Sequence, residues 1–150
     1  MKIKFLAKIM YIGIFINLVS NAHAADKKQT FLITPAMAIA DTKEKLQGDV
    51  KFFFGKQVYP NVIKKINTNS TTRKSNSFAK DDSASCNKAF LSALISLEKY
   101  AKKVGANAVV NIVSNNKDEE FSSENEFECR SGFLMSSVTL KGDFVKVNEK

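Results

Sequence analysis

The side chains of this 150-residue chain that suit acid–base chemistry are six carboxylates between residues 118 and 128, which we call the acidic segment. Glu124, Glu126 and Glu128 recur with a period of two, which would place them on one side of a strand. A carboxylate-based hydrolase would need one of these groups to be buried so that its pKa rises. The surrounding sequence is polar, so we expect the carboxylates to face solvent and assign no catalytic residue.

Histidine and metal chemistry are limited by composition. The only histidine, His23, lies in a segment that we expect to be removed. Without histidine, the chain lacks the commonest general base and the commonest metal ligand. The acidic segment could offer oxygen ligands to a weakly held Ca²⁺, but its spacing matches no EF-hand loop. We therefore predict a non-enzymatic protein with no metal site and no cofactor, and keep a carboxylate-based hydrolase as the alternative.

The two cysteines, Cys86 and Cys129, are expected to form a disulfide, because such a pair in an exported chain is usually oxidised. The bond would close a loop of about 44 residues and contribute roughly 4 kcal/mol in the chain-entropy model. The alternative, a redox-active pair, is disfavoured because such pairs usually have C-x-x-C spacing.

Positive charge gathers in residues 51–80, which we call the basic segment and which contain no acid. Basic residues interleaved with Phe and Tyr suit polyanion binding through phosphate contacts and stacking. The candidate anion-binding residues are Lys56, Lys64, Lys65, Arg73, Lys74 and Lys80. The alternative is that these side chains are the solvated faces of strands and that the acidic segment neutralises them.

Residues 1–24 have the pattern of a Sec-type signal peptide, with three early lysines, an apolar run and Ala22-His23-Ala24 before the cleavage point. The apolar run, from Ile9 to Val19, is about eleven residues, short of the roughly 20 that a membrane-spanning helix needs. We predict cleavage after Ala24 and a periplasmic or secreted protein with no transmembrane segment in the mature chain. An uncleaved N-terminal anchor is the alternative. Residues 25–150 would then form a single domain.

The main element expected to position the cysteines and the charged side chains is a long amphipathic helix at about 83–104. Its apolar positions recur every three or four residues, and Leu94 and Leu97 are predicted to be in the core. Gly105 suits a left-handed helix end, and β-branched residues of a strand at 106–113 follow at once.

The other segments favour strands. Phe52 and Phe54 of strand 50–54 should face the core, with Phe53 on the opposite face. Further strands are predicted at 62–66, 137–141 and 144–147, with a chain break at Gly142-Asp143. Residues 67–77 are either a long loop or a hairpin edge, and we favour strand at both ends with a mobile middle. The order predicts an α+β fold in which one helix covers one face of a largely antiparallel sheet.

The segment Gly105-Ala106-Asn107-Ala108-Val109-Val110, after a helix carrying Cys86 and before Cys129, resembles a group of small exported bacterial proteins of unknown function. The resemblance extends through segments 46–52, 54–55 and 140–146. Members often carry the label excinuclease ATPase subunit, but this chain has no phosphate-binding G-x-x-x-x-G-K-[ST] loop and no cysteine pairs for zinc.

The helix-Gly-Ala-Asn-Ala-Val segment is also similar to part of the lipoprotein that senses envelope stress for the Rcs phosphorelay, and to the YbjQ-like oligomers. This similarity implies a shared fold and little about function. The lipidated cysteine and second disulfide of the lipoprotein are absent here, and no Cys or His remains for a soft metal.

These observations predict an exported, non-enzymatic binding domain. Its partner would be a polyanion, such as lipopolysaccharide, anionic lipid or DNA, that contacts the basic segment. The alternative is an oligomeric structural or envelope-stress protein that acts through contacts with a protein partner or with copies of itself.

Overall fold

The longest helix, α3 (Asp82–Val104), begins one residue before the predicted start and ends where predicted. Gly105 follows in the left-handed conformation with φ of 78°, and its N–H donates to the Lys102 carbonyl. The apolar stripe is buried as predicted, with Leu94 and Leu97 at 0% and 2% exposure. The stripe therefore identifies the face of α3 that packs on the sheet.

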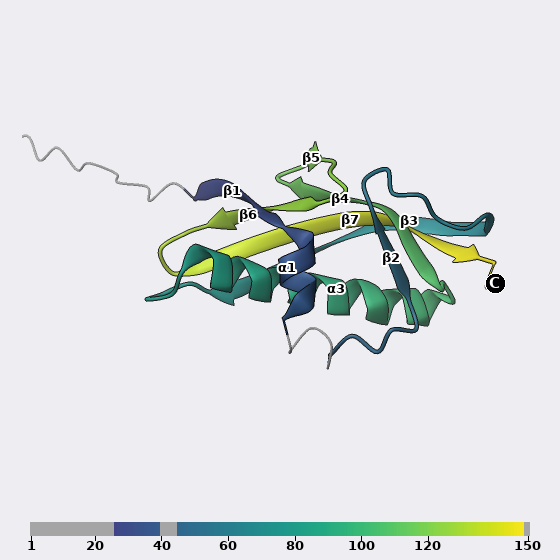
Figure 1. Cartoon of the computed structure of the whole chain (residues 1–150), viewed down its shortest axis with the longest axis horizontal. Coiled ribbons are helices and arrows are strands. Elements are labelled where there is room, and N and C mark those ends of the chain that lie inside the picture. The colour runs from purple at the N-terminus through teal and green to yellow at the C-terminus, as the bar shows by residue number, and fades with distance from the viewer. Residues whose placement is uncertain (1–25, 40–44, 149–150) are drawn as a thin grey trace, which may run out of the picture.

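The computed structural model describes residues 26–39 and 45–148, so the predicted signal peptide lies outside the described residues. The fold is α+β, as predicted: a mixed, mostly antiparallel sheet of seven strands with α3 packed on it (Figure 1). The remaining elements are β1 (Lys27–Leu32), α1 (Ile33–Ala38), β2 (Lys51–Phe54), β3 (Val62–Asn76), β4 (Ala108–Asn116), β5 (Glu119–Phe121), β6 (Glu126–Ser131) and β7 (Met135–Val147).

The long strand β7 is at the centre of the sheet. The main strand order is β1-β6-β7-β4-β2, in which β2 runs parallel to β4, and β5 pairs with β4. β3 lies along the other edge of β7 and pairs with it from Val62 opposite Val147 to Asn76 opposite Met135, with two register shifts before Asn67. Among the described strands β3 has no second neighbour, so its outer edge is open.

Two local predictions are wrong for the same reason, the length of the β3–β7 ladder. Residues 67–76 continue β3 as strand, with no unpaired middle. Gly142 lies inside β7, where an added Cβ would come within 2.7 Å of Val109 Cγ1. β4 bulges beside this position, between Val110 and Val113. Gly142 therefore allows β4 to approach β7 closely and does not end a strand.

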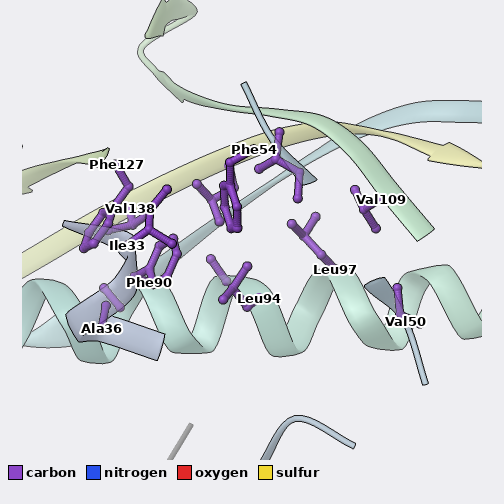
Figure 2. Packing of buried hydrophobic residues seen from close by; sticks show 14 of the residues in the cluster. Ile33, Ala36, Val50, Phe54, Phe90, Leu94, Leu97, Val109, Phe127 and Val138 are labelled. Carbon is purple, nitrogen blue, oxygen red and sulfur yellow. The ribbon is translucent and has the colours of Figure 1, made fainter. Parts of the chain in front are cut away.

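The main core lies between α3 and the sheet (Figure 2). The Phe90 ring of α3 stacks on Phe127 of β6 at 4.1 Å, and Phe54 packs on Phe90 at 6.0 Å. Phe52 also contacts this cluster, as predicted. Phe53 faces a smaller cluster on the opposite side of the sheet and contacts Tyr59, with ring centroids 5.8 Å apart.

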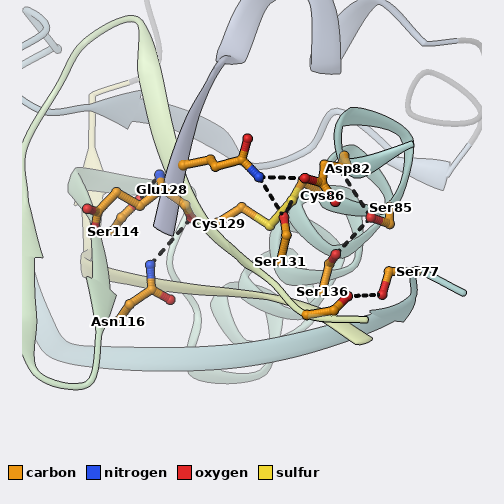
Figure 3. Close-up of a disulfide and its surroundings, with 12 residues drawn as sticks. Ser77, Asp82, Ser85, Cys86, Ser114, Asn116, Glu128, Cys129, Ser131 and Ser136 are labelled. Atoms are coloured by element: carbon orange, nitrogen blue, oxygen red, sulfur yellow. Dashed lines mark hydrogen bonds between the residues drawn. A yellow bond between two sulfur atoms is a disulfide. The ribbon is translucent and has the colours of Figure 1, made fainter. Parts of the chain in front are cut away.

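The predicted disulfide between Cys86 and Cys129 joins the N-terminal part of α3 to β6 (Figure 3). Both half-cystines are completely buried. Serine side chains reinforce the connection, because the hydroxyl groups of Ser85 and Ser136 lie 2.7 Å apart and Ser131 Oγ lies 3.3 Å from Cys86 Sγ. The start of α3 is therefore fastened to both strands that flank the β6–β7 turn.

Candidate anion-binding surface

The structure separates the residues of the basic segment. Lys64, Lys65, Arg73 and Lys74 lie on β3, Lys56 follows β2, and Lys80 lies in the β3–α3 loop. The nine residue-to-residue steps from Lys64 to Arg73 span about 30 Å of extended chain. Strand alternation places Arg73 and Lys74 on opposite faces of the sheet. The six predicted residues therefore do not form one compact patch.

A pair of like charges marks the end of the sheet near the C-terminus of α3. Lys64 lies directly opposite Lys146 of β7, and both are exposed. Phe144 packs on Tyr100 of α3 with ring centroids 4.8 Å apart, so Lys146, two residues later, lies on the α3 side of the sheet. Like charges directly opposite each other on neighbouring strands are destabilising. Among the described residues, no carboxylate forms an ion pair with either lysine.

Arg73 extends the positive charge along the same face. Its Nε donates to Ser96 Oγ of α3 at 2.7 Å, and its Nη1 donates to the Thr72 carbonyl at 2.9 Å. These bonds hold the guanidinium group between β3 and α3. Its three other N–H groups have no protein partner within the described part of the chain, so they are available to an anion.

Two lysines of α3 complete this surface. Tyr100 contacts β3 through a 2.7 Å hydrogen bond from Asn67 Nδ2, and Lys103, three residues later, shares its side of the helix. Lys99 lies four residues before Lys103, and both lysines are exposed. We define the β3–α3 basic surface as Lys64, Arg73, Lys99, Lys103 and Lys146. The sequence analysis missed the two helix lysines because it ended the basic segment at Lys80; their spacing opposite the apolar stripe was the available signal.

The acidic segment makes its ion pairs elsewhere. Glu128 and Glu119 pair with Lys28 at 2.6 and 3.7 Å, and Glu120 pairs with Lys141 at 2.7 Å. Both of these lysines lie outside the basic segment. Within the basic segment, Lys56 lines a shallow surface pocket with Glu124. The β3–α3 basic surface thus has no ion pair with the acidic segment in the described residues.

Lys65 is already paired on the opposite face of the sheet. Its Nζ lies 2.8 Å from Asp143 Oδ1, which also accepts a hydrogen bond from Thr68 Oγ1, and Asp143 Oδ2 accepts one from Asn111 Nδ2. Partial burial raises the pKa of the Asp143 carboxyl, but the hydrogen bonds from Lys65, Thr68 and Asn111 together outweigh it and hold the pKa below its ordinary value. The positive charge of Lys65 is therefore compensated within the protein.

Glu128 corrects the expectation that the acidic segment faces solvent. Its side chain is almost completely buried, and its hydrogen bond to Lys28 raises the pKa of that lysine. The backbone at Glu128 is held by β4 side chains, because its N–H donates to Ser114 Oγ at 2.8 Å and its carbonyl accepts from Asn116 Nδ2 at 3.5 Å. The expectation failed because residues distant in sequence cover this strand.

These carboxylates do not assemble a metal site in the described residues. Glu126 lies in β6 two residues before Glu128, as predicted for the same side of a strand, and accepts a hydrogen bond from Thr30 Oγ1 at 3.4 Å. Glu124 lies in the loop before β6. No three His, Cys, Asp or Glu side chains of residues 26–39 and 45–148 are close enough to hold a metal ion. No helix within the same residues is long and apolar enough to span a bilayer.

No protein-family model, curated protein or solved structure matches this chain. The resemblance of the Gly105–Val110 segment to small exported proteins therefore stays a prediction.

Proposed function

We propose that this protein is an exported, non-enzymatic binding domain that associates with a linear anionic polymer through the β3–α3 basic surface. The main support is the exposed pair of Lys64 and Lys146, which face each other across two strands without a carboxylate between them. Such a pair costs stability in the free protein. A bound phosphate or carboxylate would reduce the repulsion between Lys64 and Lys146, so this pair of lysines favours the binding of an anion.

The length of the surface favours a polymer over a single phosphate. Lys64 and Arg73 are about 30 Å apart along β3, a distance that a polymer with repeated anionic groups can span. The predicted export restricts the partners to lipopolysaccharide, other anionic envelope polymers or extracellular DNA. Each would be bound mainly through charge, so affinity should fall steeply as salt rises.

The experiment measures binding of the exported protein to labelled double-stranded DNA and to lipopolysaccharide at low and at physiological salt. The variant Lys64→Ser/Lys103→Ser/Lys146→Ser should weaken DNA binding and reduce the logarithmic salt slope by roughly 0.9 per lysine removed. Its stability should stay the same or rise slightly, because exposed substitutions usually fall within about ±0.5 kcal/mol each and the repulsion between Lys64 and Lys146 is removed.

A matched control removes the same charge from elsewhere on the molecule. Lys51, Lys56 and Lys117 are exposed and lie outside the β3–α3 basic surface. Their replacement by Ser should leave the salt slope closer to that of wild type than the first variant does. Failure of the wild-type protein to bind either polyanion at low salt would end this proposal, and equal effects of the two variants would show that the charge acts without a defined surface.

The alternative function is assembly with protein chains. It is supported by the open edge of β3, which offers unpaired backbone groups along 15 residues, a recurrent basis for strand addition. Self-association or capture of a peptide through this edge would persist at high salt. Sedimentation at low and high salt therefore separates the two functions.

A further inference from the structure

Four exposed apolar side chains project from one end of the molecule. Phe78 comes from the β3–α3 loop, Phe133 and Leu134 come from the β6–β7 turn, and Met135 begins β7. Their exposed fractions are 55%, 72%, 60% and 45%. The two phenylalanine rings meet edge to face, with centroids 5.5 Å apart. We call these four residues the apolar tip, because grouped exposure of this kind marks an interaction site more often than single exposed residues do.

The apolar tip is held in place by hydrogen bonds between its two segments. Ser77 N–H donates to the Leu134 carbonyl at 3.0 Å, and Ser77 Oγ donates to the Gly132 carbonyl at 2.6 Å (Figure 3). Gly132 N–H closes the turn by donating to the Met135 carbonyl at 2.9 Å. The buried disulfide and the contact between Ser85 and Ser136 fasten the two strands that flank the β6–β7 turn to α3. The apolar side chains thus lie at an end of the fold that hydrogen bonds and the disulfide hold in place.

β1, the first described strand, begins at the same end of the fold (Figure 1). Lys27, the first residue of β1, pairs with Ser131, and a Cβ added to Gly132 would lie 2.8 Å from Asp26 Oδ1. Asp26, the first described residue, therefore lies beside the apolar tip.

Charged groups border the apolar tip. Lys80 follows Phe78 by two residues, Lys74 precedes it by four, and both are exposed without an ion pair among the described residues. The nearby aspartates include Asp81 and Asp82 at the start of α3. Asp81 accepts from Ser83 Oγ and Asp82 from Gln29 Nε2, each at 2.6 Å. The two lysines are therefore free to meet anionic headgroups.

We propose that the apolar tip inserts into the interface of a bilayer that contains anionic lipid. Phe78 and Phe133 enter the boundary between headgroups and acyl chains, where aromatic rings are favourable, and Lys74 and Lys80 contact the headgroups. This proposal goes beyond the polymer-binding function and uses none of the residues of the β3–α3 basic surface. It gives the protein a defined orientation, with the disulfide-bonded end toward the membrane.

The chain contains no tryptophan, so Phe133→Trp places its single tryptophan in the apolar tip. Vesicles of phosphatidylethanolamine and phosphatidylglycerol should shift its emission to the blue, and brominated acyl chains should quench it. The control is Val58→Trp, at a residue that is 94% exposed and precedes the far end of the β3–β7 ladder. Its emission should not change with vesicles. Absence of a shift at Phe133→Trp, or an equal shift in the control, would overturn the proposal.

A second measurement compares the partition of unlabelled protein into the same vesicles. Phe78→Ser/Phe133→Ser should lower the partition coefficient about tenfold or more, because two aromatic side chains no longer leave water. The matched control Val58→Ser/Ile63→Ser removes exposed apolar side chains from the other end and should bind like wild type. Equal binding by all three proteins would refute insertion, as would self-association that depends on Phe78 and Phe133 without vesicle binding.

The polymer-binding proposal and the membrane-insertion proposal can be refuted independently. Phe78→Ser/Phe133→Ser should keep wild-type affinity for soluble DNA, whereas Lys64→Ser/Lys103→Ser/Lys146→Ser should keep the emission shift when combined with Phe133→Trp. Loss of both activities in both variants would indicate misfolding, which far-UV circular dichroism and urea unfolding of each variant would reveal. Correctly folded variants that lose both activities would overturn the separate roles of the two surfaces.

Discussion

Replacing both cysteines by alanine, Cys86→Ala/Cys129→Ala, should remove a large share of the stability of this fold. The two residues are 43 positions apart, so the closed loop contains most of α3 and all of β4 and β5. A loop of about 44 residues gives an entropic contribution of about 4 kcal/mol at 25 °C in the chain-entropy model. Small domains have total unfolding free energies of about 5–15 kcal/mol, so the variant should be only marginally stable.

Urea unfolding followed by circular dichroism measures this loss, with the free energy extrapolated to water for wild type and variant. Wild-type protein unfolded in the presence of a reductant provides the control, because it loses the crosslink but keeps both sulfur atoms in the core. Agreement between variant and reduced protein would assign the loss to the crosslink. A loss below about 1 kcal/mol would contradict the entropic argument, and two free thiols in exported protein would contradict the bond itself.

Two further substitutions test the packing of α3 and the polar cluster at Asp143. Leu97→Ala should lower the unfolding free energy by about 2–5 kcal/mol, since Leu97 is 2% exposed. The control Lys99→Ala, on the solvent side of α3, should change it by less than about 0.5 kcal/mol. Equal melting temperatures of the two variants would contradict the assigned buried face of α3. The lowered pKa of Asp143 means that its carboxylate stabilises the fold above the unfolded value of about 4, and that this stabilisation is lost as the pH falls through the folded-state pKa. Asp143→Asn should therefore cost about 1 kcal/mol at pH 7 and progressively less in acid, and a cost independent of pH would refute the assignment.

Local sequence determined the helix, the disulfide and the fold class. The apolar stripe of α3 repeats at the helical period, and Gly105 ends the helix by a conformation that glycine adopts without strain. Cys86 and Cys129 had no other partners in the chain. Alternation in Phe52-Phe53-Phe54 likewise predicted the two faces of β2 correctly. These features depend on residues close in sequence or on composition, so they can be predicted without knowledge of strand pairing.

Tertiary structure alone decided which distant residues meet. The β3–β7 register brings Lys64 opposite Lys146, and the packing of β4 against β6 buries Glu128. The same long-range pairing converts residues 67–76 from an expected mobile segment into strand and places Gly142 under the bulge of β4. The apolar tip forms because one turn and one loop, 55 residues apart between Ser77 and Gly132, are joined by a hydrogen bond. Strand register and close backbone approach are properties of pairs of segments, so neither segment's own sequence contains them.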